Sequence, residues 1–133
     1  MPRTWTHTSA FAHFGTKPRN VQWSWSARSE NGKTVVATLW QDLFSRKDGR
    51  LIYSRPGVDP STPDKRPGFG ELMENFSWAR DHCAGSFKVI VAIAKDVKAE
   101  PRSIAECFPS KMTMKLTRLD TTTGAFTAEA EGV

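Results

Sequence analysis

VQWSWSARSENGKTVVATLW, residues 21–40, is the stretch from which we predict the fold. Its first arm is hydrophobic at every second position, the period of a β-strand with two unlike faces: Val21, Trp23, Trp25 and Ala27. Asn31-Gly32 follows, a dipeptide that tolerates positive φ at both positions of a two-residue hairpin turn. A run rich in β-branched residues then leads to Trp40. The stretch therefore predicts a β-hairpin.

The turn also predicts which side chains share a face. With Asn31 and Gly32 at the turn, Trp25 lies opposite Thr38 and Trp23 opposite Trp40, and a register shift of two residues would leave the faces unchanged. Three tryptophans then share one face, where they either fill a core or line a pocket, and the sequence leaves both open. The other face looks solvated, because it carries Ser24, Ser26 and Arg28.

Composition indicates a soluble globular protein of one domain, residues 1–133. Hydrophobic residues make up 38% of the chain and charged residues 25%. No apolar run approaches the roughly 18 residues that cross a bilayer, and no signal peptide opens the chain, so we expect no membrane association and a cytoplasmic location. Cys83 and Cys107, the only two cysteines, are expected to be buried free thiols.

Positive charge is concentrated in the N-terminal half. Residues 1–66 hold 11 Lys and Arg against 5 Asp and Glu, a net charge of +6, whereas residues 67–133 hold 8 against 9, a net charge of −1. Four of the five tryptophans lie in the same basic half. This combination indicates affinity for a polyanion such as DNA or RNA, with an ordinary solvated basic surface as the alternative.

Local patterns predict the remaining elements. In chain order they are one or two helical turns at residues 9–15 with Ser9 as N-cap, a turn at 47–50, a strand at 51–54, a main helix at 71–84 and a strand buried on both faces at 86–95. A short helix or irregular segment at 103–108 is halted by Pro109, and two strands of alternating pattern, 111–116 and 126–130, flank a hairpin turn at 120–124. Hairpins dominate and no βαβ rhythm occurs. We therefore predict an α+β fold: a curved, mostly antiparallel sheet or small β-barrel of about six strands, with one main helix.

Residues 55–70, RPGVDPSTPDKRPGFG, are predicted to form a long loop. They contain four of the eight prolines and three glycines, which argues against a helix or an inner strand. A connection of this length is either a mobile segment or a lid over a neighbouring site. Its Lys65-Arg66 pair would give a lid a positive tip.

Chemical motifs favour a binding protein over an enzyme. The chain has no Gly-rich phosphate loop, no nucleophile elbow and no zinc-ligand spacing, so we expect no metal and no cofactor and assign no catalytic residue. A small enzyme would use Asp81, His82 or Glu106, which are titratable residues in or beside the predicted helices.

Aromatic and basic residues make the leading candidate site. Indole rings stack on bases and Lys and Arg neutralise phosphates, so we expect a ligand to contact Trp23, Trp25, Trp40 and Arg28. The nucleic-acid backbone would meet the basic turns and the loop: Lys17, Arg19, Arg46, Lys47, Arg50, Lys65 and Arg66.

The order of elements over roughly residues 20–131 resembles the small barrels of the PUA-like group. The shared succession is a Trp-bearing hairpin, a long polar loop, a helix, a buried strand and a final hairpin. The group includes EVE and YTH domains, so the resemblance implies recognition of a modified base in an aromatic pocket. The segments WSWSAR, NFSWARDHC and RSIAECFP also resemble a small bacterial protein family of unassigned function, which implies no mechanism.

Three hypotheses follow from the sequence. The first is a non-enzymatic module that engages nucleic acid or a modified base through an aromatic pocket and basic turns. The second is a protein-interaction or structural module whose tryptophans are all buried. The third is a small enzyme. The sequence leaves the oligomeric state open.

Overall fold

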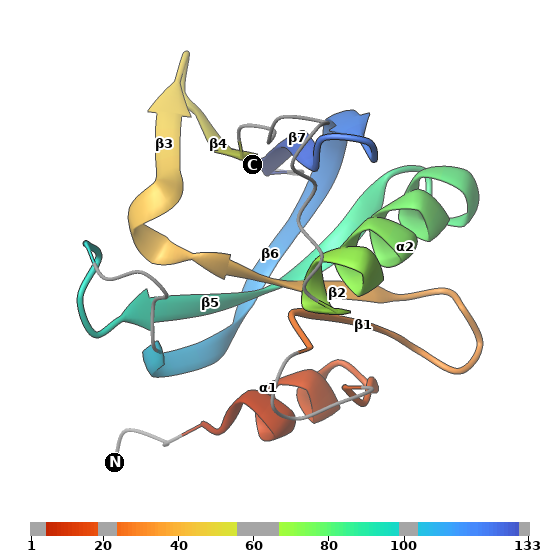
Figure 1. Cartoon of the computed structure of the whole chain (residues 1–133), viewed down its shortest axis with the longest axis horizontal. Coiled ribbons are helices and arrows are strands. Elements are labelled where there is room, and N and C mark those ends of the chain that lie inside the picture. Colours follow the sequence, from red (N-terminus) through yellow and green to blue (C-terminus); the bar gives the residue numbers. More distant parts are fainter. Residues whose placement is uncertain (1–4, 19–23, 56–66, 99–103, 131–133) are drawn as a thin grey trace.

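The computed structural model describes residues 5–18, 24–55, 67–98 and 104–130, which form two helices and one mixed sheet (Figure 1). The elements are α1 (His7–His13), β1 (Ser26–Arg28), β2 (Val35–Trp40), a short 3₁₀ helix η1 (Gln41–Leu43), β3 (Phe44–Lys47), β4 (Arg50–Arg55), α2 (Pro67–His82), β5 (Ser86–Ala94), β6 (Ile104–Asp120) and β7 (Ala125–Ala130). The seven strands follow the order β1-β2-β5-β6-β7-β4-β3, and only β2 and β5 pair in parallel. The predicted α+β class with a mostly antiparallel sheet is confirmed.

The sheet is open rather than closed into a barrel, so that alternative of the prediction is wrong. β1 and β3 are its two edges. The sheet nevertheless curls strongly: β2 and β4 are not neighbours in the strand order, yet the hydroxyl of Tyr53 in β4 accepts a hydrogen bond from the backbone N–H of Trp40 in β2 at 3.3 Å. Among the described helices, none is long and apolar enough to span a membrane.

The predicted hairpin forms in the predicted register. Ser26 lies opposite Ala37 and Ala27 opposite Val36, and the Thr38 N–H donates to the Trp25 carbonyl at 2.8 Å. The turn is wider than expected, since the Ser29 N–H bonds to the Thr34 carbonyl and the residues between them form a four-residue loop. Only Gly32 takes a positive φ there, at 72°, so Asn31 does not act as the second left-handed residue.

Helix α1 begins earlier than predicted. Thr6, not Ser9, is its N-cap, and the two residues form a reciprocal capping box in which each side chain accepts a bond from the other's backbone N–H. Gly15 follows the C-cap with φ 74°, as a helix stop requires. Ala10 and Phe11 are fully buried and attach α1 to the face of the sheet that we call the outer face.

Helix α2 packs on the opposite face, the inner face, and builds the main core. Phe76 is fully buried between Phe87 of β5 and Phe126 of β7, with ring centroids 4.9 and 4.8 Å apart. Each such ring stabilises the fold by about 2–3 kcal/mol. The expectation that Ser24 and Ser26 face water is wrong, because both are buried. Asn75 of α2 donates to the Ser26 hydroxyl at 2.8 Å.

The predicted loop 55–70 is shorter than expected at both ends. Arg55 ends β4, and α2 begins at Pro67, because proline suits the first turn of a helix, where no intrahelical N–H bond is needed. Residues 56–66, with Lys65 and Arg66, lie outside the described residues.

Strand β5 is central and buried, as predicted. The prediction of a short helix or irregular segment at 103–108 is wrong, because strand β6 begins at Ile104 and includes these residues. β6 is one strand of 17 residues that runs through Pro109. Proline lacks the N–H that the ladder needs, and the register between β5 and β6 shifts between Lys88 and Ile90, the partner of Pro109. The Ser110 hydroxyl donates to the Val89 carbonyl at 2.8 Å, which supplies a donor beside the proline.

Candidate nucleic-acid interface

Trp25 and Trp40 lie together on the outer face of the sheet. Their ring centroids are 5.3 Å apart, and the His7 ring of α1 lies 5.9 Å from Trp25. Both indoles are half-buried. Trp23 lies outside the described residues. The two described hairpin tryptophans therefore belong to an aromatic cluster beside α1 and keep part of each ring open to solvent.

His7 is a neutral member of this cluster. Its Nε2 atom lies 2.7 Å from the Thr38 hydroxyl, and its ring centroid is 4.7 Å from that of Phe11. Burial lowers the pKa of His7 to about 4 from an ordinary 6.5. At neutral pH the cluster thus presents aromatic surface without a positive charge from His7.

Arg28 lies on the other side of the sheet from Trp25 and Trp40. Its guanidinium sits 4.3 Å above the ring of Trp78 in α2, and the His82 ring stacks against the same indole at 3.9 Å. The Trp78 N–H donates to the Gly32 carbonyl at 2.7 Å. Arg28 therefore helps to fasten the tip of the β1–β2 hairpin to α2, and the structure does not bring it to the hairpin tryptophans.

The predicted basic turns are dispersed. Lys17 is exposed just after α1, whereas Arg46, Lys47 and Arg50 are exposed at the tip of the β3–β4 hairpin, at the edge of the sheet opposite β1. Arg50 pairs with Glu129 of β7 at 3.2 Å. Arg19 lies outside the described residues. The structure thus separates the β3–β4 cations from the aromatic cluster.

A larger set of cations shares the outer face of β5, β6, β7, β4 and β3. Met114 and Leu116 point into the core from β6, so Lys111, Thr113 and Lys115, which alternate with them, point outward. A register shift between Leu116 and Arg118 interrupts this alternation and turns Arg118 outward as well. Residues that lie opposite each other on neighbouring strands point to the same side of the sheet. Lys88 lies opposite Thr113, Arg118 opposite Thr127 and Lys47 opposite Arg50, so the face continues across these strands. We call this surface the cationic sheet face: Lys47, Arg50, Lys88, Lys111, Lys115 and Arg118, with the hydroxyls of Ser54, Thr113, Thr117 and Thr127.

The cationic sheet face carries few acids. Among the described strand residues that point outward there, Glu129 is in the middle of the array, while Asp48 and Asp120 lie at the turns that end it. Asp120 is engaged locally, because its carboxylate accepts bonds from the N–H groups of Thr122 and Thr123, which lowers its pKa. Six cations against three acids leave a net charge of +3.

Sequence reasoning missed four of these six cations. The C-terminal half has a net charge of −1, so charge counted along the chain does not point to Lys88, Lys111, Lys115 or Arg118. The signal was present in the alternation of Lys111, Thr113 and Lys115 with Met112 and Met114, which places like side chains on one face of a strand.

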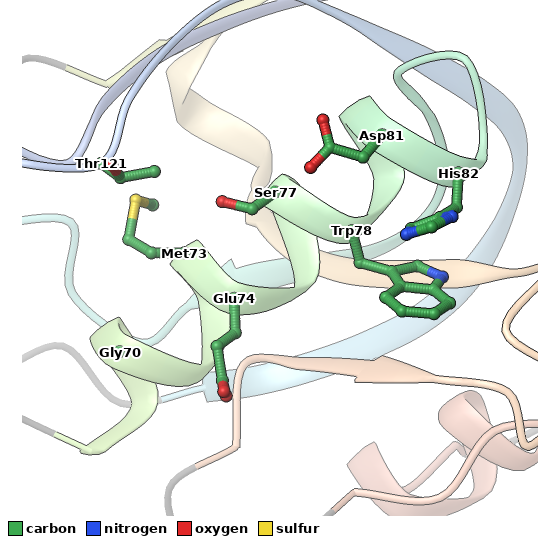
Figure 2. A pocket seen from close by; sticks show the side chains of 8 residues that line it. All are labelled: Gly70, Met73, Glu74, Ser77, Trp78, Asp81, His82 and Thr121. Carbon is green, nitrogen blue, oxygen red and sulfur yellow. The ribbon is translucent and has the colours of Figure 1, made fainter.

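A shallow depression of about 420 Å³ lies along α2. Figure 2 shows Ser77 and Asp81 projecting from one side of the helix, and Trp78 and His82 from another. Thr121, from the β6–β7 turn, also lines it. Neither Trp25 nor Trp40 does, so this depression is distinct from the aromatic cluster.

Of the three residues that a small enzyme would use, the structure brings only two to one site. Asp81 and His82 line the α2 depression, but Glu106 does not and pairs in β6 with Ile93. The Arg80 guanidinium donates to Asp81 at 3.1 Å and lowers the pKa of that carboxyl. In the described part of the chain, no three His, Cys, Asp or Glu side chains are grouped to hold a metal ion.

The two cysteines differ in burial. Cys107 is buried beneath α1, as expected, whereas Cys83 is half-buried, with its thiol 3.6 Å from the carbonyls of Gly32 and Lys33. Desolvation raises the pKa of both thiols, which disfavours the reactive thiolate.

Comparison of the chain with known proteins finds no relative. The chain matches no family model, no curated protein and no solved structure. The likeness to PUA-like barrels in element order therefore stays a prediction.

Proposed function

We propose that the protein is a non-enzymatic module that binds nucleic acid, with the phosphate backbone lying on the cationic sheet face. The observation that carries the proposal is the outward row of Lys111, Lys115 and Arg118 on β6, all exposed and uncovered by α2. Lys and Arg that neutralise phosphates release condensed counterions, which supplies most of the affinity in backbone binding. Neighbouring hydroxyls such as that of Thr117 can donate to phosphate oxygens.

The sheet suits this role because it holds its cations at fixed spacings. Lys111 and Lys115 are four residues apart on one strand, which separates their Cα atoms by about 13 Å. The net charge of +5 adds a long-range attraction for the same ligand. Lys47 and Arg50, which the sequence already suggested, extend the surface at its edge.

The hairpin indoles have a secondary place in this proposal. A base that stacks on an indole contributes about 1–3 kcal/mol. Trp25 and Trp40 are both half-buried, so a base could stack only on the exposed part of either side chain. The backbone proposal does not depend on it.

The test is oligonucleotide binding followed by fluorescence anisotropy across a salt series. If four of the six cations contact phosphates, affinity should fall about 100-fold between 50 and 200 mM salt. The triple variant Lys111→Glu, Lys115→Glu, Arg118→Glu should lose at least about 100-fold in affinity, because each lost contact costs about tenfold near 0.1 M salt. All three side chains are exposed, so the fold should persist.

A matched control carries the same change of charge elsewhere. Lys33, Lys95 and Lys98 are exposed in loops outside the cationic sheet face, and their triple Glu variant should bind severalfold more weakly at most. Equal losses in the two triple variants would mean that net charge, rather than this surface, governs binding. Absence of binding by the wild-type chain at low salt would refute the proposal.

The packing of the hairpin indoles favours one competing function, a structural or protein-interaction module. Trp25 and Trp40 contact each other, and Trp25 also contacts His7. If this is their whole role, acrylamide should quench tryptophan fluorescence poorly and oligonucleotides should leave the emission unchanged. The salt series separates the two functions independently of the indoles.

A further inference from the structure

The β3–β4 hairpin forms an arm at one edge of the sheet. β3 is an edge strand that pairs with β4, and Figure 1 shows the hairpin rising away from both helices. Asp48 and Gly49 make the tip, with φ 54° and 78°, as a tight two-residue turn requires. Because this turn matches the twist of the strands, the arm is a regular two-stranded ribbon rather than an irregular loop.

The arm carries cations on both of its faces. Successive side chains of a strand point to opposite sides, so Lys47 and its partner Arg50 face outward while Arg46 faces the other way. All three are exposed, and Glu129 holds Arg50 at 3.2 Å, on the same surface as Lys115. A ribbon with cations on both faces can contact two phosphate strands at once, one on each side.

The cationic sheet face contains no aromatic side chain among its described strand residues. Proteins that hold single strands stack the bases on aromatic rings, whereas a duplex hides its bases and presents phosphates outward. The surface beside the arm is therefore suited to a duplex.

We infer that the ligand is a B-form DNA duplex and that the β3–β4 arm enters its major groove while the cations of β6 contact the adjoining backbone. This inference rests on the proposed function. Ile52 still pairs with β7, and two residue pairs, Arg46 with Leu51 and Lys47 with Arg50, carry the arm about 10 Å beyond it to the turn at Gly49. The B-form major groove is about 12 Å wide and 8.5 Å deep and admits a two-stranded ribbon.

The groove geometry also distinguishes DNA from RNA. An A-form duplex has a deep, narrow major groove that side chains do not reach, so the arm would stay outside it. In B-form DNA, Asp48 at the tip lies toward the floor of the groove, away from the phosphate walls, where a carboxylate can accept a bond from the cytosine N4 amino group.

The experiment compares ligands and two matched variants. Anisotropy near 0.1 M salt is measured with a labelled DNA duplex of about 20 base pairs, its two single strands and the RNA duplex of the same sequence. The arm variant is Arg46→Ala, Lys47→Ala, and the face variant is Lys111→Ala, Arg118→Ala. Each variant removes two exposed cations, and circular dichroism verifies that each is folded.

The wild type should bind the DNA duplex at least tenfold more tightly than the other probes. The arm variant should lose about 100-fold on the DNA duplex but at most about tenfold on the single strands or RNA duplex, because only Lys47 of its two cations belongs to the cationic sheet face. The face variant should weaken all probes alike. Equal wild-type affinity for single strands and duplex, or an arm variant that weakens every probe equally, would overturn the inference and leave the proposed function intact. No binding to any probe would overturn both.

Discussion

His7 gives the most direct test of how α1 is attached to the sheet. Its ring is buried against Phe11 and Trp25, and its pKa is lowered to about 4 from 6.5 in the unfolded chain. Between these two values the unfolded chain binds a proton that the folded chain does not. The stability that neutral His7 contributes is therefore complete above pH 6.5 and is lost as the pH falls toward 4.

The magnitude follows from the size of the shift. A shift of 2.5 pKa units corresponds to roughly 3 kcal/mol over the whole window, of which about 2 kcal/mol is lost by pH 5. Because His7 belongs to the short helix α1, which is anchored by Ala10 and Phe11, part of the loss should appear as local release of α1.

The assay is urea denaturation followed by tryptophan fluorescence at about pH 8 and pH 5. His7→Gln keeps a polar group for the Thr38 hydroxyl but cannot titrate, so its loss of stability on acidification should be about 2 kcal/mol smaller than that of the wild type. His13→Gln is the matched control, since His13 lies on the same helix and is exposed. The reasoning is refuted if His7→Gln retains the wild-type pH dependence, or if His13→Gln removes it.

Two further predictions concern the hairpin tip and the cationic sheet face. Gly32→Ala should destabilise the fold by about 1–3 kcal/mol more than Gly49→Ala in urea denaturation. Both glycines have positive φ, but only a Cβ at Gly32 would lie 2.7 Å from the Trp78 ring. Equal losses would show that the ring moves aside. Glu129→Gln should strengthen oligonucleotide binding about threefold to tenfold by freeing Arg50, and weaker binding would show that the ion pair is needed to hold the arginine in place.

Elements set by local chemistry were predicted well. The β1–β2 hairpin keeps its expected register because the turn residues and the period-two pattern point to the same pairing. Helix α2 has the expected apolar stripe, with Leu72, Phe76 and Ala79 buried. The parallel pairing of β2 with β5 was not predictable in the same way, since it joins segments about 50 residues apart and leaves no local mark.

The error at β6 shows where local signals mislead. Pro109 normally excludes an inner strand, and the residues before it suit several conformations. β6 continues through Pro109 because its pairing with β5 shifts register near Ile90 and because the Ser110 hydroxyl donates to the Val89 carbonyl. A serine directly after a strand proline is a weak signal, and it becomes informative only when the partner strand is known.

The candidate interface was missed for a different reason. Charge counted along the chain sums residues that the fold places on different surfaces. In the C-terminal half, Glu74 and Asp81 are exposed on α2, while Lys111, Lys115 and Arg118 project from the opposite face of the sheet. A segment of net charge −1 therefore contributes most of a cationic surface. Charge sorted by strand face would have found Lys111 and Lys115, whereas Arg118 reaches the same face only through the register shift after Leu116.

The outer face of the sheet has an apolar half and a cationic half, and helix α1 covers the apolar half. Where β1, β2 and β5 present Ala27, Val36 and Ile90, exposure to water would be costly, and α1 covers that patch. A helix with an apolar face cannot also cover the part of β6 that carries Lys111 and Lys115, because these side chains would lose their hydration without gaining partners. The cationic half therefore stays open in the free protein. A ligand that brings its own negative charge can offset that desolvation penalty through ion pairs and released counterions, which is why a phosphate backbone suits this surface better than an apolar protein partner.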